Sequence, residues 1–266
     1  GTNPDARQYI YDVVHEIYQN WGVRYFKLDA NVWGALPFGI RHDKNATAVE
    51  AYRFGMEAVF AATDNNAFIL GCNAPIWPSL GVITAMRVTN DVIRKVKHMA
   101  NLSEQCFNRN WMHNTLWIND PDCLIMSDAI SPVMDPAGII HKSPAKKKFY
   151  RLNNIYIRAS GGIVLSGDYI SKYTEEDVER LQRILNTDHA AAKFDDLFEI
   201  GKTESENGVE YFIFNRSKFL KKYSIPVPGG YSATDMYNYN TMAVKNGAVS
   251  FYLRRNDCVW IFVSRK

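Results

Sequence analysis

The sequence predicts two successive architectures: a partial (β/α)8 barrel, comprising about the last five βα units, and then a small antiparallel β-sandwich domain. Short apolar strands alternate with amphipathic helices as far as residue 185. Each of these strands ends in a polar or acidic residue before an irregular loop, which is typical of the catalytic end of a barrel. From about residue 194, short strands follow one another across Gly, Asn and Pro turns. We therefore expect the barrel part at residues 1–190 and the antiparallel β domain at residues 191–266.

The first predicted helix begins with a clear capping signal. Asn3 precedes Pro4 at the first helical position, and Gly22 ends the helix. Four more helices are expected from the spacing of apolar residues, at about 46–62, 93–110, 144–159 and 174–185. Acidic residues in the first turn favour the start of the last one.

Five apolar runs between these helices predict parallel strands, at 23–29, 67–72, 84–88, 115–119 and 162–166. A closed barrel needs eight strands, so about three βα units are missing. The chain also opens directly on a helix cap, without the basic and apolar stretches of a signal peptide. We therefore expect it to be continuous with, or completed by, an upstream segment, to be poorly soluble and inactive alone, and to be capable of homo-oligomer formation.

The predicted β domain consists of short alternating stretches, at 197–200, 209–214, 223–227, 248–253 and 258–263. Their period of two residues and their short turns favour antiparallel pairing.

Composition excludes several kinds of partner. The net charge is only +3, and no apolar run approaches the roughly 18 residues that a membrane span needs. The run Lys146–Lys148 opens a helical pattern and is better explained as a solvated turn than as a nucleic-acid patch. The four cysteines show neither a CxxC pair nor metal-ligand spacing, and their low density suits a reducing, cytoplasmic location.

The first candidate catalytic group is Asp29, which closes the strand at 23–29. Lys27 lies two residues earlier and therefore points to the same side. A buried lysine beside a carboxylate keeps it ionised, as a nucleophile requires. The alternatives are a structural ion pair, or an unrelated barrel enzyme that uses Lys27 as a Schiff-base amine.

Asp91 follows the third predicted strand and would supply a second acid at the same end of the barrel. Glycoside hydrolysis needs such a pair, in which one carboxylate attacks the anomeric carbon and the other protonates the leaving oxygen. The alternative is that Asp91 caps a helix beginning near Val92.

Several blocks of the sequence together resemble the α-galactosidase branch of glycoside hydrolase family 36, of the type active on raffinose and melibiose. The blocks are Tyr25–Asp29, Ala51–Met56, Phe68–Pro75 with Trp77–Gly81, Ala85–Asp91 and Leu116–Cys123. The Lys-x-Asp motif of that family places the nucleophile at Asp29, and its Met-Arg-x-x-x-Asp motif places the acid/base at Asp91. The resemblance implies a retaining exo-α-galactosidase that acts by double displacement without a metal or an organic cofactor.

The resemblance also implies supporting roles around the sugar. Lys27 would bind the ring hydroxyls, and Arg87 would lie near the 2-hydroxyl or near Asp91. Cys72 would line the wall of the site, although a small buried apolar residue at a strand end is the simpler explanation. Trp33 would form an aromatic wall or pack in its loop. Asp120 or Asp122 would orient Arg87 or the substrate, or form turns, and Asp168 is a weaker candidate of the same kind.

Two positions depart from the commoner family pattern. Asn73 stands where many relatives have Gly, and Thr84 where many have Asp, which leaves the preference at the sugar 2-position open. An α-N-acetylgalactosaminidase with a roomier pocket at Cys72 and Asn73 is therefore the nearest alternative. A non-catalytic sugar-binding fragment is the alternative from another class. The upstream β-sandwich and first βα units of the family have no counterpart among these residues.

Overall fold

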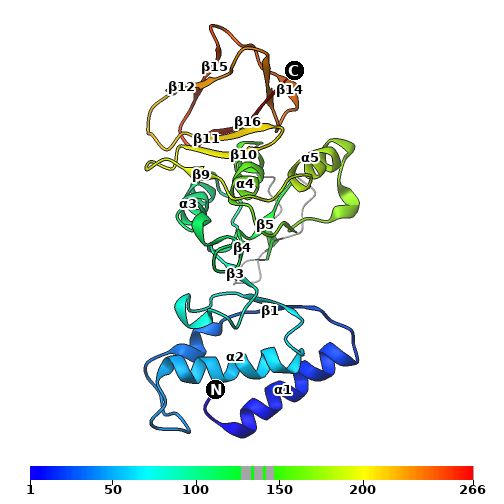
Figure 1. The fold of residues 1–266 in the computed structure, drawn as a ribbon, viewed down its shortest axis with the longest axis vertical. Helices are drawn as coiled ribbons and strands as arrows, with labels where there is room; N and C mark the ends of the chain where they lie inside the picture. Colours follow the sequence, from blue (N-terminus) through cyan, green and yellow to red (C-terminus); the bar gives the residue numbers. More distant parts are fainter. Residues whose placement is uncertain (127–132, 135–139, 142–146, 266) are drawn as a thin grey trace. The chain divides into compact units, whose positions relative to one another are not determined.

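The computed structural model describes residues 1–126, 133–134, 140–141 and 147–265, and the chain divides into two units (Figure 1). Unit 1 comprises residues 1–87 and 114–120, and unit 2 comprises residues 88–113 and everything from 121 onward. The domain boundary expected after residue 190 stays a prediction.

A four-stranded parallel sheet organises unit 1, in the order β1-β2-β3-β4. Its strands are β1 (Tyr25–Leu28), β2 (Phe68–Gly71), β3 (Ala85–Arg87) and β4 (Ile118–Asp120). All four were predicted, and their parallel pairing is confirmed. The central strands are fully buried at Ile69, Leu70 and Ala85, as expected for parallel strands covered on both faces.

Two helices of unit 1, α1 (Pro4–Gln19) and α2 (Ala48–Ala62), pack against each other (Figure 1). The predicted cap of α1 is confirmed, because the Asn3 side chain accepts hydrogen bonds from two backbone N–H groups of the first turn. A capping box between Thr47 and Glu50 begins α2. Two short 3-10 helices, η1 (Asn31–Ala35) and η2 (Trp77–Ser79), follow β1 and β2.

Unit 2 begins with the remaining helices and short strands. Its helices are α3 (Val96–Phe107), η3 (Asn110–Met112), α4 (Lys147–Ser160), η4 (Ile170–Lys172) and α5 (Glu175–Leu185). Its first strands are β5 (Cys123–Leu124), β6 (Val133–Met134), β7 (Ile140–His141) and β8 (Leu165–Ser166). Strands β5 and β8 pair in parallel, and β6 and β7 pair antiparallel.

The prediction of five βα units is therefore confirmed only in part. The strand expected at 162–166 is shortened to β8, and it pairs with β5 rather than joining the four-stranded sheet. No pattern had indicated β5, because two residues are too few to show a period. The helix expected at 93–110 is also shorter than predicted, and the predicted start of the helix at 144 and Lys146 lie outside the described residues. Lys147 is exposed at the start of α4.

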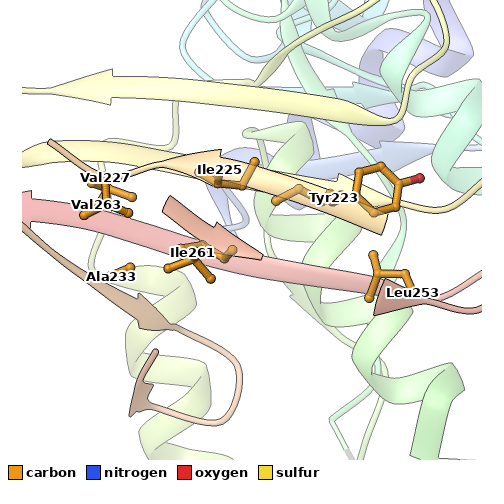
Figure 2. Close-up of a cluster of buried hydrophobic side chains, with 9 residues drawn as sticks. Tyr223, Ile225, Val227, Ala233, Leu253, Ile261 and Val263 are labelled. Atoms are coloured by element: carbon orange, nitrogen blue, oxygen red, sulfur yellow. The ribbon is translucent and has the colours of Figure 1, made fainter. Parts of the chain in front are cut away.

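The antiparallel part of unit 2 consists of two sheets. The larger has the strand order β14-β13-β16-β11-β10-β9, and the smaller pairs β12 with β15. The strands are β9 (Lys193–Phe194), β10 (Ile200–Ser205), β11 (Gly208–Phe214), β12 (Lys221–Pro226), β13 (Tyr231–Asp235), β14 (Asn240–Thr241), β15 (Ala248–Leu253) and β16 (Cys258–Arg265). Figure 2 shows apolar side chains of both sheets gathered between them, among them Ile225 of β12 and Ile261 of β16. This two-layer packing confirms the predicted sandwich.

The strand predicted at 197–200 is wrong. A turn occupies most of that stretch, in which the Asp195 carboxylate accepts the N–H of Glu199 at 2.8 Å and Phe198 has a φ of 52°. A local side-chain hydrogen bond here competes with strand pairing. Strand β13 was missed because Tyr231–Asp235 carries few strongly apolar residues, and its pairing with β16 forms it.

Among the helices that the structure describes, none combines the length and apolar character that crossing a membrane requires.

Candidate active site

Asp29 leaves the carboxyl end of β1 and is exposed to solvent. Its Oδ1 accepts the backbone N–H of Ala30 at 2.6 Å. Ala30 has a φ of 58°, a left-handed conformation that costs an alanine free energy and is often found at functional sites. Phe26 is buried whereas Lys27 is exposed, as expected from alternation along the strand. The chain thus holds the Asp29 carboxylate in a fixed turn at the end of the sheet.

Several interactions hold the pKa of Asp29 below its usual range. The largest is the hydrogen bond from the Ala30 N–H, followed by a hydrogen bond from the Cys72 thiol. The positive charges of Lys27 and Arg87 act in the same direction and contribute less. The expectation of a buried Lys27 that controls the carboxylate is therefore wrong, because Lys27 is exposed and water screens its charge. Asp29 is still held in the ionised form that a nucleophile needs.

Cys72 follows β2 and brings its thiol to Asp29. Its side chain is buried, and burial raises the pKa of the Cys72 thiol to about 11, while the charge of Arg87 opposes this shift. The thiol is therefore neutral at physiological pH and can donate its hydrogen to the carboxylate. Cys72 is a small buried residue, as the simpler explanation expected. Its hydrogen bond to Asp29 also helps to position that carboxylate.

Asn73 adopts a φ of 47° directly after Cys72. Its backbone carbonyl accepts the N–H of Val32 at 2.8 Å, which ties the loop after β2 to η1. Glycine and asparagine tolerate this conformation best, so the exchange of Gly for Asn at this position has a backbone reason. The side chain of Asn73 is exposed, and Trp33 in η1 is 71% exposed. Most of the Trp33 side chain is therefore in contact with solvent and not packed within its loop.

Arg87 and Asp120 form the most buried charged pair of unit 1 among the described residues. Arg87 Nε lies 2.9 Å from Asp120 Oδ2, and the two side chains are 5% and 0% exposed. They are direct register partners on β3 and β4. The hypothesis that one acid of the Asp120–Asp122 stretch orients Arg87 is confirmed for Asp120. Thr84 supports the same sheet, where its hydroxyl accepts the N–H of Ile69 at 3.2 Å.

Asp91 lies in unit 2, in the irregular segment before α3. The helix begins only at Val96, after Lys95, so the alternative that Asp91 caps a helix near Val92 is wrong. Its side chain is exposed, and its backbone carbonyl accepts a hydrogen bond from His98 Nε2 at 2.8 Å. The pairing of the Asp91 and Asp29 carboxylates stays a prediction.

Two further acids shape the loops of unit 2 near Asp91. Asp122 Oδ2 accepts the N–H of Val92 at 2.6 Å and thereby holds the segment after Asp91. Asp168 accepts the N–H of Met126 at 2.6 Å, and its other oxygen lies 3.5 Å from Arg94. Sequence reasoning missed Arg94, whose side chain is 13% exposed. Its place three residues after Asp91 was the only signal in the sequence.

In the part of the chain that the structure describes, no three His, Cys, Asp or Glu side chains converge as ligands for a metal ion.

Comparison with known proteins finds chains of similar fold among solved structures of glycosidases, although no family model matches the chain. The chain is similar to a GH27 β-L-arabinopyranosidase from Geobacillus stearothermophilus, with a TM-score of 0.74, 16% identity, and coverage of 98% of this chain and 62% of that one. For a candidate α-galactosidase (melibiase) of Bacteroides fragilis the TM-score is 0.67 at 16% identity, over 96% of this chain and 57% of that one. For a candidate α-N-acetylgalactosaminidase of Bacillus halodurans the TM-score is 0.66 at 12% identity, over 100% of this chain and 63% of that one.

The chain thus spans about three fifths of the length of these proteins. The similarity runs through both the parallel sheet and the antiparallel domain, since it covers nearly the whole chain. Membership of family 36 in particular stays a prediction, because one of these structures belongs to family 27. At these identities the fold is what is shared, and the chain has the fold of this group of glycoside hydrolases.

Proposed function

We propose that this chain carries the catalytic residues of a retaining exo-α-galactosidase, which releases terminal α-linked galactose from oligosaccharides of the raffinose and melibiose type. The observation that carries the proposal is the state of Asp29. Its carboxylate stands at the carboxyl end of a parallel strand, exposed to a substrate, while the Ala30 N–H and the Cys72 thiol hold it ionised. A retaining glycosidase needs an ionised carboxylate of this kind as its nucleophile.

The proposed reaction has two displacements. Asp29 attacks the anomeric carbon while Asp91 gives a proton to the leaving oxygen, which forms a covalent galactosyl ester on Asp29. Asp91, now a carboxylate, takes a proton from water, and that water cleaves the ester and frees galactose with its original configuration. Lys27, Asn73 and Trp33 are exposed near this strand end and are the proposed contacts to the sugar.

Arg87 has a more indirect part in this proposal. Asp120 neutralises and fixes it, and its positive charge lowers the pKa of Asp29. We further propose that upstream strands or a second chain complete the site. Strand β1 pairs only with β2 among the described strands, which leaves its other edge for such a partner.

The decisive experiment uses the polypeptide together with its upstream segment and p-nitrophenyl α-galactoside as substrate. Asp29→Ala should lower kcat by several orders of magnitude, because the covalent step is lost. Azide should restore turnover and give a β-galactosyl azide. Asp12→Ala, which removes an exposed carboxylate from α1, should leave kcat unchanged. Near-normal activity of Asp29→Ala would refute the assignment, and an inactive parent protein would favour the non-catalytic sugar-binding alternative.

The acid/base and the sugar need separate measurements. Loss of the Asp91 carboxyl should impair substrates with poor leaving groups far more than aryl galactosides, since only the former need protonation. Equal impairment of both would contradict this role. Parallel assays with aryl α-N-acetylgalactosaminide and aryl β-L-arabinopyranoside then identify the sugar, because similar folds are known for proteins with these names.

A further inference from the structure

A cavity lies within unit 2, and no proposed catalytic residue lines it. It is a groove of about 1170 Å³ between the end of α5 and the strands β10 and β11. Helix α5 is held at its edge, because Arg183 Nε donates to the backbone carbonyl of Met236 at 3.1 Å. Ligand pockets commonly have volumes of about 300–1,000 Å³, so the groove has room for more than one sugar residue.

The charged side chains of this groove form ion pairs with one another. Arg158, only 2% exposed, contacts Glu210 and lies 3.8 Å from Asp188. Glu210 also accepts hydrogen bonds from Thr203 at 2.8 Å and from the Trp260 indole at 2.9 Å. Because these charges already have partners, an anion or a cation would have to displace an existing pair. An uncharged ligand could bind without displacing any of these pairs.

Polar side chains without a partner line the same groove. Gln182, Asn186 and Asn207 are exposed, and within the described residues their amide groups make no intramolecular hydrogen bond. Each amide can both donate and accept, which matches the hydroxyl groups of a saccharide. The buried Arg158 Nε is another donor without a partner among the described atoms.

An aromatic ring stands at the edge of this polar lining. The guanidinium of Arg183 lies 4.9 Å from the ring centre of Tyr239, yet Tyr239 is still 65% exposed. With a cation over one face, the other face is available to an apolar surface such as the C–H face of a pyranose. Phe262 and Met236 add apolar side chains to the lining of the groove.

We propose that this groove is a non-catalytic binding site for a neutral saccharide, which packs on Tyr239 and exchanges hydrogen bonds with Gln182, Asn186 and Asn207. Such a site would hold an oligosaccharide on the protein independently of the chemistry at Asp29. The proposal therefore stands or falls separately from the α-galactosidase function.

The test follows the side-chain amide signals of Gln182, Asn186 and Asn207 by NMR while the whole chain is titrated with raffinose. These signals should shift at millimolar raffinose. Tyr239→Ala should weaken the binding they report about tenfold, since an exposed aromatic anchor is lost. Tyr252→Ala is the matched control, because Tyr252 on β15 is 63% exposed and does not line the groove, and it should leave the titration unchanged.

Asn207→Ala provides a second variant in the turn between β10 and β11, and it should weaken the shifts of the other two amides. Absence of shifts with raffinose would overturn the proposal. A titration that is unchanged in both Tyr239→Ala and Asn207→Ala would also overturn it. So would amide shifts that inorganic phosphate causes and raffinose does not. Loss of binding in Tyr252→Ala as well would place the saccharide elsewhere and refute the groove.

Discussion

Removal of the Asp120 carboxylate should be among the most destabilising single changes in unit 1. Asp120→Ala leaves the Arg87 guanidinium, 5% exposed, without the carboxylate that lies 2.9 Å away. A buried charge that loses its partner cannot regain its hydration, and such losses cost about 3–5 kcal/mol. Because the two residues are register partners, the change also loosens the pairing of β3 with β4. We expect a fall of this size in the free energy of unfolding.

Urea denaturation of the whole chain, followed by circular dichroism so that both units are observed, measures this change. A matched control is Glu204→Ala, which removes a pair with the same 2.9 Å separation to Lys202 but with both side chains exposed. That control should show no measurable loss, since exposed pairs are solvated and screened. The double variant Arg87→Met/Asp120→Leu should regain much of the stability, because it leaves no unpaired charge. A loss for Asp120→Ala no greater than for Glu204→Ala would refute the reasoning.

Three other predictions concern single positions. Cys72→Ala should raise the pKa of Asp29, because the thiol hydrogen bond favours the ionised carboxylate, whereas Cys72→Ser should keep the pKa low. NMR titration of the Asp29 carboxyl carbon measures this pKa, and equal values in the parent protein and both variants would contradict the contact. Ala30→Gly should stabilise the protein by about 1 kcal/mol, because glycine adopts the φ of 58° at this position without strain. Ala58→Gly, inside α2, should destabilise it by about 1 kcal/mol in the same urea assay. Thr174→Ala should cost about 1 kcal/mol through loss of the capping box of α5, and an unchanged thermal midpoint would argue against that cap.

Much of the secondary structure was predictable because its signals are local. The cap at Asn3 and the start of α5 follow from neighbouring residues, and the structure confirms both. The strands of the parallel sheet were found for the same reason, since their apolar runs are set off by polar residues. Asp29 was identified as a candidate from its place at the end of such a strand, before any partner was known.

Local signals failed where distant contacts compete with them. Asp91 has the sequence of a helix cap, but Asp122 takes the N–H of Val92 and α3 begins later. Strand β5 exists only because β8 pairs with it. In each case the deciding partner lies far along the chain, and no window of neighbouring residues contains it.

The sequence by itself therefore determined the five long helices, the four strands of the parallel sheet, the antiparallel character of the last part of the chain and the place of Asp29. Only the tertiary structure decided which groups beyond the adjacent Ala30 N–H hold that carboxylate. Its pKa depends on Cys72 from the next strand more than on Lys27 from its own, and Arg87 is fixed by Asp120 from 33 residues away. The physical reason is that burial and hydrogen bonds govern charged groups more strongly than exposed neighbours do, and the contacts of Cys72 and Asp120 arise only when separate strands come together.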